Sequence, residues 1–336
     1  ATTNPKFGVV LEPTDWLRLR ASWGKSFNAP SASDQLASLA NTLAVTPIAL
    51  ISPPNGSPPP AGAFTIVRFG SVDNLKPQSS TSLSYGFDLT PPWIEGLSLS
   101  GTIYQVSFRD QLGNPPFFNA AEMFAHFADY VQLFPDATQI ADAAKGVAGG
   151  DAQVAQFLAV GGPQVYVIID ARSRNLGSSK VRGLDFAASY KRETGFGSID
   201  FGLSGNYQLS RKFAVSQSAP LLPVDLSYFN RLRMTANIGA TIGRFRAQAT
   251  WNHLGGYRIA PSPTGHQDSV DAFNVVNLFF KYDIPTPPLA RKLALTLNID
   301  NLFDQDPPTL RSDGSTGITN GSTLGRFIQL GINAKF

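Results

Sequence analysis

The chain has 336 residues, of which 15% are charged, and its formal net charge is only +3. So small a charge, without a basic run, argues against nucleic-acid binding, and the absence of cysteine excludes a disulfide framework or a thiolate metal site. No segment approaches the roughly 18 uninterrupted apolar residues of a membrane-spanning helix. Because Ala1 is not followed by the basic start and apolar core of a signal peptide, we interpret the chain as a fragment that begins within its architecture.

Alternation of apolar and polar residues runs through most of the chain. It begins with Phe7, Val9 and Leu11 and ends with a segment in which Leu330 shares its parity with the terminal Phe336. Side chains alternate across a β-strand, so each such segment predicts a strand with one apolar and one polar face. The eleven strands predicted in this way cover residues 6–12, 17–24, 81–89, 97–109, 183–190, 198–208, 231–242, 244–253, 276–284, 293–300 and 323–336.

The predicted connections alternate between short and long along the whole chain. The short ones centre on residues 13–15, 91–96, 193–197, 243 and 285–290, and the long ones cover 27–78, 111–177, 213–229, 258–271 and 304–322. Barrels of the outer membrane have short periplasmic turns and long extracellular loops, and their tilted strands need about ten residues to cross the bilayer. We therefore expect an all-β fold, a transmembrane antiparallel β-barrel whose C-terminus is periplasmic.

Five stretches, in the same order along the chain, resemble the C-terminal half of TonB-dependent outer-membrane receptors. They are Trp23–Ser31, Leu75–Ser80, Asn175–Phe186 with Gly183 and Asp185, Asn301–Asp304, and the terminal Gln329, Gly331, Ala334 and Phe336. The sequence departs from the family pattern at Gln78, where Glu is usual, and at Ala334, where an aromatic residue is more frequent. The resemblance implies a barrel of about 22 strands, of which residues 1–336 would supply the last eleven. The plug domain, the TonB box and the first half of the barrel are expected to be absent from these residues.

The resemblance also implies a function. Such receptors lie in the outer membrane of Gram-negative bacteria and take up a scarce, large solute with energy from the TonB complex of the inner membrane. A ferric siderophore is the expected ligand. The other implied partners are outer-membrane lipids and the barrel-assembly machinery, which would recognise Gln329, Gly331 and Phe336 as a membrane-insertion signal. No catalytic activity, nucleic-acid partner, resident cofactor or protein-held metal is expected.

Several arginines lie on the polar parity of the predicted strands, and we expect them to face the barrel interior. The set comprises Arg18, Arg20, Arg231, Arg233, Arg244 and Arg246. A guanidinium group can hold a carboxylate through two hydrogen bonds, so these residues are candidate contacts for an anionic ligand. Alternatively, they pair with carboxylates of the plug or barrel, such as Asp185, Asp200 and Asp300. Arg18 and Arg231 lie at opposite ends of their strands, so the set does not form one patch.

The long segment 111–164 carries apolar residues at helical spacing. They are Met123, Phe124, Phe127, Tyr130, Val131 and Phe134, followed by Asp136 and Asp151 as candidate caps of two further short helices. Phe124, Phe127 and Tyr130 are candidate ligand contacts in an aromatic lid; alternatively, the insertion packs its own apolar face. Residues 27–78 are rich in proline around 53–60, so we predict that the whole segment is an irregular loop, with a stiff, solvated stretch at the prolines.

Two other classes of function share some of these features. A passive, substrate-selective porin would have the same barrel and the same loop asymmetry without a plug. An outer-membrane hydrolase would need a serine and a histidine on facing strands. His253 is the only histidine on a predicted strand, and it lies on the apolar parity. Neither it nor His126 and His266 has the spacing of a protein-held metal site.

Overall fold

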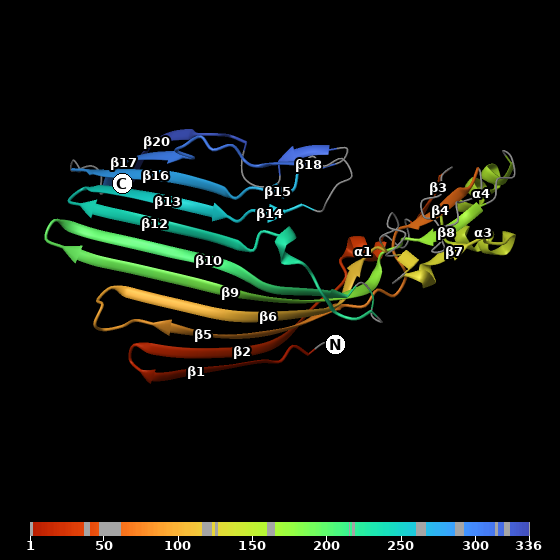
Figure 1. Ribbon diagram of the computed structural model, residues 1–336, viewed down its shortest axis with the longest axis horizontal. Helices are drawn as coiled ribbons and strands as arrows, with labels where there is room; N and C mark the ends of the chain where they lie inside the picture. Colours follow the sequence, from red (N-terminus) through yellow and green to blue (C-terminus); the bar gives the residue numbers. More distant parts are fainter. Residues whose placement is uncertain are drawn as a thin grey trace.

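The computed structural model describes residues 3–36, 41–46, 62–115, 123–124, 127–159, 165–214, 216, 219–259, 267–285, 292–312, 315–318 and 323–335. Its main feature is one large antiparallel sheet in which eleven strands follow one another in chain order (Figure 1). These are β1 (Lys6–Thr14), β2 (Leu17–Asn28), β5 (Gln78–Leu89), β6 (Leu97–Gly113), β9 (Arg174–Thr194), β10 (Gly197–Ala214), β12 (Leu232–Ile242), β13 (Phe245–Leu254), β16 (Phe273–Ile284), β17 (Lys292–Asp300) and β20 (Phe327–Lys335). All eleven predicted strands and the predicted all-β antiparallel fold are confirmed. Within the described residues the sheet does not close: β1 pairs only with β2, and β20 only with β17.

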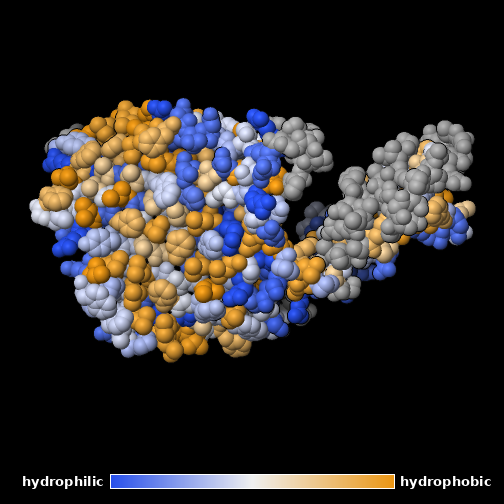
Figure 2. Space-filling model, in the orientation of Figure 1, coloured by the Kyte–Doolittle hydropathy of each residue, from blue (hydrophilic) through white to orange (hydrophobic). Residues whose placement is uncertain are grey.

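The register of the sheet places apolar residues of successive strands side by side. Ala21 lies opposite Tyr85, Tyr85 opposite Ile103, and Ile103 opposite Leu184. Because side chains alternate across a strand, such rows form one face and the intervening residues form the other. We call these the apolar face, which carries Tyr85, and the polar face, which carries Asp185. Hydrophobic residues cover much of the sheet in the space-filling view, and hydrophilic ones gather toward the end that bears the long connections (Figure 2).

Short and long connections alternate along the sheet, as predicted. The short turns lie together at one end of the sheet, where the C-terminus also lies, and the N-terminus lies at the other end (Figure 1). Gly96 shows why one of these turns needs glycine. It has a φ of +83°, and a Cβ at this position would lie 1.7 Å from the carbonyl oxygen of Lys191. A residue with a side chain could not adopt this φ easily or approach the neighbouring strand β9 so closely.

A second unit, which we call the loop subdomain, projects from the end of the sheet opposite the short turns (Figure 1). It is built from the two longest connections, between β2 and β5 and between β6 and β9. Its sheet has the order β3-β4-β8-β7, in which β4 and β8 are parallel. Its elements are β3 (Thr42–Thr46), β4 (Phe64–Phe69), η1 (Ala128–Tyr130), β7 (Val131–Leu133), α3 (Ala137–Ala144), α4 (Gly150–Ala159) and β8 (Val165–Asp170).

The loop subdomain has two hydrophobic clusters, to which its strands contribute alternately. Val67 and Tyr166 belong to one cluster, whereas Ile66 and Ile168 pack with Ile140 of α3 in the other. Burial on both faces explains why β4 and β8 read as nearly continuous apolar runs. The prediction that all of 27–78 is irregular is therefore wrong for β3 and β4, which are held by tertiary pairing. The prolines of 53–60 lie outside the described residues.

The helix predicted from the spacing of residues 123–134 forms only in part. The Phe127 N–H donates to the Met123 carbonyl at 2.8 Å, as in a helical turn. The 3-10 turn η1 follows, and the chain then enters β7, where Val131 lies opposite Ile169 of β8. Pairing with β8 supplies the backbone hydrogen bonds that a longer helix would have made. The predicted continuous helix is thus wrong beyond η1.

The two predicted helix caps had different outcomes. Asp136 caps α3 in a capping box with Gln139, as predicted. Asp151 lies inside the first turn of α4, which begins at Gly150, so its assignment as a cap is wrong. Shorter elements complete the fold: α1 (Ala32–Leu36), β11 (Leu222–Pro223), η2 (Leu226–Tyr228), β14 (Tyr257–Arg258), β15 (Ser269–Val270), β18 (Thr309–Ser312) and β19 (Ser315–Ile318). No helix within the described ranges is both long and apolar enough to cross a membrane.

Candidate functional site on the polar face

A charged pair spans three strands of the polar face. Arg246 of β13 reaches across β12 to Asp200 of β10, with Nη1–Oδ1 and Nη2–Oδ2 distances of 2.7 and 3.1 Å. Gly239 of β12 lies between them, and a Cβ there would lie 2.7 Å from Asp200 Oδ2 and 3.0 Å from Arg246 Nη2. The missing side chain at residue 239 therefore leaves room for this two-pronged ion pair. Such paired hydrogen bonds fix the plane of the guanidinium group.

Two more arginines of the predicted set have partners on β1, β5 and β6. Arg20 Nη2 donates to Thr102 Oγ1 at 2.8 Å and lies 3.3 Å from Asp88 Oδ1. Arg18, nearer the short turn, donates to Glu12 at 2.7 Å. Both pairs are largely exposed and contribute little to stability. Their guanidinium groups nevertheless already have carboxylate partners within the chain, and contact with a ligand stays a prediction for both.

Arg233 of β12 has different surroundings. It lies opposite Asn206 of β10, which in turn lies opposite Asp185 of β9. The Asn206 amide donates to Asp185 Oδ1 at 2.7 Å and lies 3.0 Å from the Tyr104 hydroxyl of β6. Among the described residues, no carboxylate forms an ion pair with Arg233. Within the described ranges, the Arg233 guanidinium therefore has no carboxylate at ion-pair distance.

Arg233 lines a hollow of about 490 Å³ near the end of the sheet that bears the long connections. The amide of Asn206 and the carboxylate of Asp185 belong to its wall, as do Thr235 and Asn252, which are joined by a 2.9 Å hydrogen bond. Leu254 at the end of β13 and Phe273 and Val275 at the start of β16 add apolar side chains to the lining. A wall of this kind suits a ligand that presents anionic and hydrogen-bonding oxygens beside apolar surface.

The remaining two arginines of the predicted set lie outside this hollow. The Arg231 guanidinium lies 4.9 Å from the centroid of the Tyr207 ring, and its Nε donates to the Gln208 carbonyl at 3.4 Å. Arg244 lies in the turn between β12 and β13, so the prediction that it belongs to a strand is wrong. Arg244 is the second residue of this two-residue turn, and its carbonyl oxygen accepts a hydrogen bond from the Asp283 N–H.

The loop subdomain contains a charge cluster that alternation of residues did not reveal. Asp170, at the end of β8, lies 2.6 Å from Arg172 Nη2 and 2.7 Å from Arg174 Nη2. Burial raises the pKa of Asp170, but hydrogen bonds and charges from both arginines outweigh burial and hold the pKa well below its usual range. The Arg174 guanidinium also lies 4.1 Å from the centroid of the Tyr130 ring. Burial lowers the pKa of the neighbouring Arg68, as do the charges of Arg172 and Arg174.

The three aromatic residues predicted to contact a ligand share one cluster of the loop subdomain. Phe127 is 3% exposed and packs with Met123 and Tyr166. Phe124 and Tyr130 are partly buried against the same cluster. This packing resembles the alternative in which the insertion buries its own apolar face. Contact of these residues with a ligand stays a prediction.

The predicted membrane-insertion signal lies on the last strand. Gln329 and Gly331 of β20 lie opposite Asn298 and Thr296 of β17. A Cβ at position 331 would lie 2.7 Å from Thr296 Oγ1, so glycine has a local packing role here. Phe336 lies outside the described residues. Recognition of these residues by an assembly machinery stays a prediction.

His253 lies on the apolar face, near the end of β13. Its Nδ1 is 2.8 Å from Asn274 Oδ1, which also accepts a hydrogen bond from Trp251 Nε1 at 3.1 Å. This amide contact does not have the serine–histidine arrangement of a hydrolase. His126 and His266 lie outside the described residues. Within the described ranges, no group of three or more histidine, aspartate or glutamate side chains could hold a metal ion.

Comparison with known proteins gives one family and one set of similar folds. The family model for the TonB-dependent receptor-like β-barrel matches residues 1–302. A mutant ferric enterobactin receptor, PfeA of Pseudomonas aeruginosa, solved with enterobactin, superposes with a TM-score of 0.62 at 15% identity over 99% of this chain. The siderophore receptor PirA of Acinetobacter baumannii gives 0.57 at 13% identity over 98% of this chain, and the FrpB iron transporter of Neisseria meningitidis gives 0.54 at 16% over 99%.

These solved structures are similar in fold and are longer than the chain. The present chain covers 40% of the length of PfeA, 40% of that of PirA and 38% of that of FrpB. No curated protein matches the sequence. The structural likenesses therefore concern the fold of the sheet, and the family match concerns nearly the whole chain.

Proposed function

The chain belongs to the TonB-dependent receptor β-barrel family, and from this premise we propose that it is part of a receptor that takes up a ferric siderophore across the outer membrane. In this proposal, further strands complete the barrel, a plug domain fills it, and the TonB complex supplies the energy. The barrel-assembly machinery inserts it through its last strand. The protein binds and moves its ligand without a catalytic step of its own.

The alternation of connections supports one orientation in the membrane. The short turns and the C-terminus lie at the same end of the sheet (Figure 1). In outer-membrane barrels the short turns are periplasmic and the long loops extracellular. In our proposal the loop subdomain is therefore extracellular, the apolar face contacts lipid, and the polar face lines the interior.

The arrangement around Arg233 supports an anionic ligand. Its guanidinium lines a hollow near the extracellular end, has no ion-pair partner among the described residues, and adjoins the bonded Asp185 and Asn206. Ferric siderophores offer charged and hydrogen-bonding oxygens, which suit a guanidinium donor. We propose that Arg233 contacts the ligand, whereas Arg246 holds Asp200 and stabilises the barrel wall.

Uptake of radiolabelled iron tests this proposal. Cells that express the full-length receptor would be given iron as catecholate, hydroxamate or carboxylate siderophore chelates, with and without a functional TonB complex. We expect uptake of at least one chelate, and only with TonB. Iron uptake without TonB would indicate a passive pore, and no uptake of any chelate would refute the siderophore proposal.

Arginine variants then test the site. Arg233→Ala should weaken binding of the transported chelate by about 1.5–3 kcal/mol, roughly 10- to 150-fold, because a charge-assisted hydrogen bond is lost. Arg233→Lys should recover part of this loss, since the charge remains. Arg246→Ala, the matched control, should lower the stability of the receptor and leave affinity nearly unchanged. Equal losses of affinity at both positions would contradict the assignment of Arg233.

A further inference from the structure

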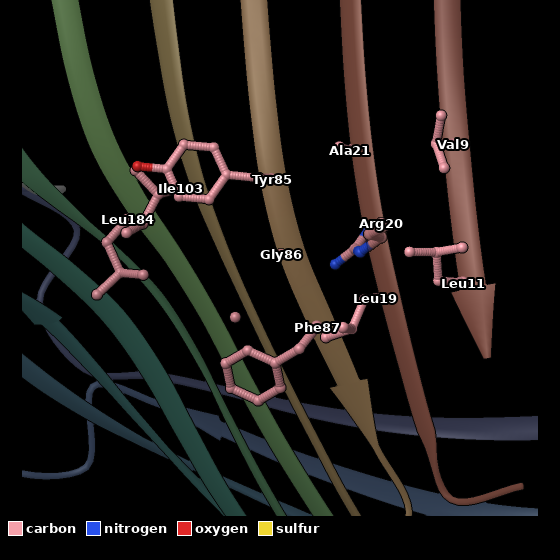
Figure 3. Close-up of a pocket in the computed structure, with 11 residues that line it drawn as sticks. Val9, Leu11, Leu19, Arg20, Ala21, Tyr85, Gly86, Phe87, Ile103 and Leu184 are labelled. Atoms are coloured by element: carbon pink, nitrogen blue, oxygen red, sulfur yellow. The ribbon is translucent and has the colours of Figure 1, made fainter. Parts of the chain in front are cut away.

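The apolar face carries a groove that the proposed uptake does not use. It measures about 430 Å³ and crosses β1, β2, β5, β6 and β9 (Figure 3). Its lining consists of Val9, Leu11, Leu19, Arg20, Ala21, Tyr85, Gly86, Phe87, Gly101, Ile103 and Leu184. The charged end of Arg20 is turned to the polar face, where it meets Thr102 and Asp88. The exposed wall is therefore apolar.

Small residues and two leaning rings create this groove. In Figure 3, the Tyr85 ring extends from β5 toward Ile103 and Leu184, and the Phe87 ring extends to the same side of β5. The Phe87 ring lies over Gly101 of β6, where a Cβ would be 2.8 Å from its Cε1. Ala21 of β2 lies opposite Tyr85, and its small side chain leaves the groove open above β2. The rings of Tyr85 and Phe87 thus form the walls of the groove, and the small residues Ala21 and Gly101 form its floor.

The groove lies close to the end of the sheet that bears the short turns. Leu19 is two residues from the start of β2, and Phe87 is two residues from the end of β5. At about 3.4 Å per residue, the groove begins roughly 7 Å from that end, within the leaflet depth of roughly 15 Å set by a hydrocarbon core of about 30 Å. Beyond it lie Trp16 and Trp93, whose rings meet edge to face at 5.3 Å. Tryptophan rings are enriched at the level of lipid headgroups.

We propose that this groove holds one acyl chain of a phospholipid from the periplasmic leaflet. The inference rests on the proposed orientation, which places the short turns in the periplasm and the apolar face in lipid. Tyr85 and Phe87 are 46% and 41% exposed, so a chain between them would cover apolar ring surface without displacing any protein group. The groove is continuous with the rest of the apolar face, which lipid covers in the same orientation. Its concave shape lets one acyl chain contact protein on several sides, whereas a flat part of the face offers one side.

Native mass spectrometry of the full-length receptor, extracted in mild detergent, tests the proposal by counting the phospholipids that remain bound. Ala21→Phe would fill the groove with a side chain that lipid tolerates. Ala249→Phe is the matched control, since Ala249 also lies on the apolar face, opposite Ile238 and Leu278. We expect the wild type and Ala249→Phe to retain one phospholipid that Ala21→Phe lacks. Equal counts in all three proteins would overturn the proposal, as would the loss of lipopolysaccharide instead of phospholipid.

A second variant keeps the test decisive if Ala21→Phe fails to insert. Tyr85→Ala removes one wall and should also lose the bound phospholipid, whereas an unchanged count in this folded variant would refute the groove. The lipid count needs no siderophore, so it remains informative if no chelate is transported. Conversely, normal TonB-dependent uptake with no groove-dependent lipid would refute only the lipid site.

Discussion

The side chain of Asn175 binds the backbone of Lys76, which lies 99 residues earlier in the chain. Its Oδ1 accepts the Lys76 N–H at 2.7 Å, and its Nδ2 donates to the Lys76 carbonyl at 2.8 Å. The same Nδ2 donates to the Asp110 carbonyl at 2.7 Å. The Asn175 side chain, at the start of β9, thus connects the segment just before β5 with the end of β6. The loop subdomain leaves the sheet at this place. Two of the stretches that carry the family resemblance therefore meet in a structural clasp.

Replacing Asn175 by alanine should loosen this clasp. The loss of its hydrogen bonds should lower the free energy of unfolding by about 1–3 kcal/mol, measured by urea unfolding of the receptor in detergent. Asn28→Ala is the control, because Asn28 is exposed at the end of β2. If both variants were equally stable, the clasp would contribute nothing to stability.

Acid should weaken the loop subdomain through Asp170. Its pKa is lowered in the folded state, because contacts with Arg172 and Arg174 outweigh the effect of burial. Its contribution to stability is thus complete above the ordinary carboxyl pKa of about 3.9 and is lost as pH falls below that value toward the folded pKa. Proteolysis of the loop subdomain should accelerate over this acidic range.

Asp170→Asn should remove that pH dependence. At neutral pH it should lower the free energy of unfolding by less than the roughly 3–5 kcal/mol typical of fully buried pairs, since the two arginines that lose their counter-charge are partly buried. Asp129→Asn is the control, because Asp129 is exposed in the same subdomain. An Asp170→Asn subdomain that resisted protease as well as the wild type would contradict the role of this cluster.

Gly239 offers a steric test of the Asp200–Arg246 pair. A Gly239→Val side chain would collide with both partners, so it should separate them and destabilise the barrel. In an Arg246→Ala background the same change should cost less, with a coupling energy of about 1–3 kcal/mol. Gly8→Val is the control, since the nearest atom to a Cβ there is 3.8 Å away. Additive effects of the two substitutions would exclude the proposed collision.

Asn301 allows backbone strain and hydrogen bonding to be separated. It is 6% exposed, has a φ of +52°, and exchanges two hydrogen bonds with the backbone of Gln305. Asn301→Gly should lose the hydrogen bonds alone, whereas Asn301→Ala should lose them and also strain the backbone. The alanine variant should be less stable than the glycine variant by about 1–2 kcal/mol, measured by urea unfolding. Equal stability would mean that the backbone shifts to a negative φ.

Much of the large sheet could be predicted from the sequence because alternation is a local signal. Phe7, Val9 and Leu11 indicate a strand with one apolar face without reference to any other part of the chain. The parallel pair of β4 and β8 could not be predicted in this way, since it joins segments on opposite sides of two barrel strands. The apolar run Val165–Asp170 is the sequence feature that indicates a buried strand. Such a run has no alternation, and it does not indicate which strand pairs with it.

The candidate site was predictable only as a set of arginines on one parity. Arg233 and Arg246 occupy equivalent positions in that pattern, yet only Arg246 forms an ion pair with a carboxylate of the described residues. The difference depends on register, which places Gly239 between Asp200 and Arg246. Sequence alternation specifies the face of a strand, but not which residue of another strand lies across from it.

The direction of the two outermost strands limits how the sheet can be completed. Every neighbouring pair in the eleven-strand path is antiparallel, so β1 and β20 point toward the same end. Joining these two edges directly, or to the edges of a second copy in the same orientation, would create a parallel seam. An all-antiparallel barrel instead requires an odd number of intervening strands, the first and last of which run opposite to β1 and β20. A duplicate of this sheet would also supply eleven strands, an odd number. The direction of the first and last strands, and not their number, therefore distinguishes a complementary segment from a duplicate in the same orientation.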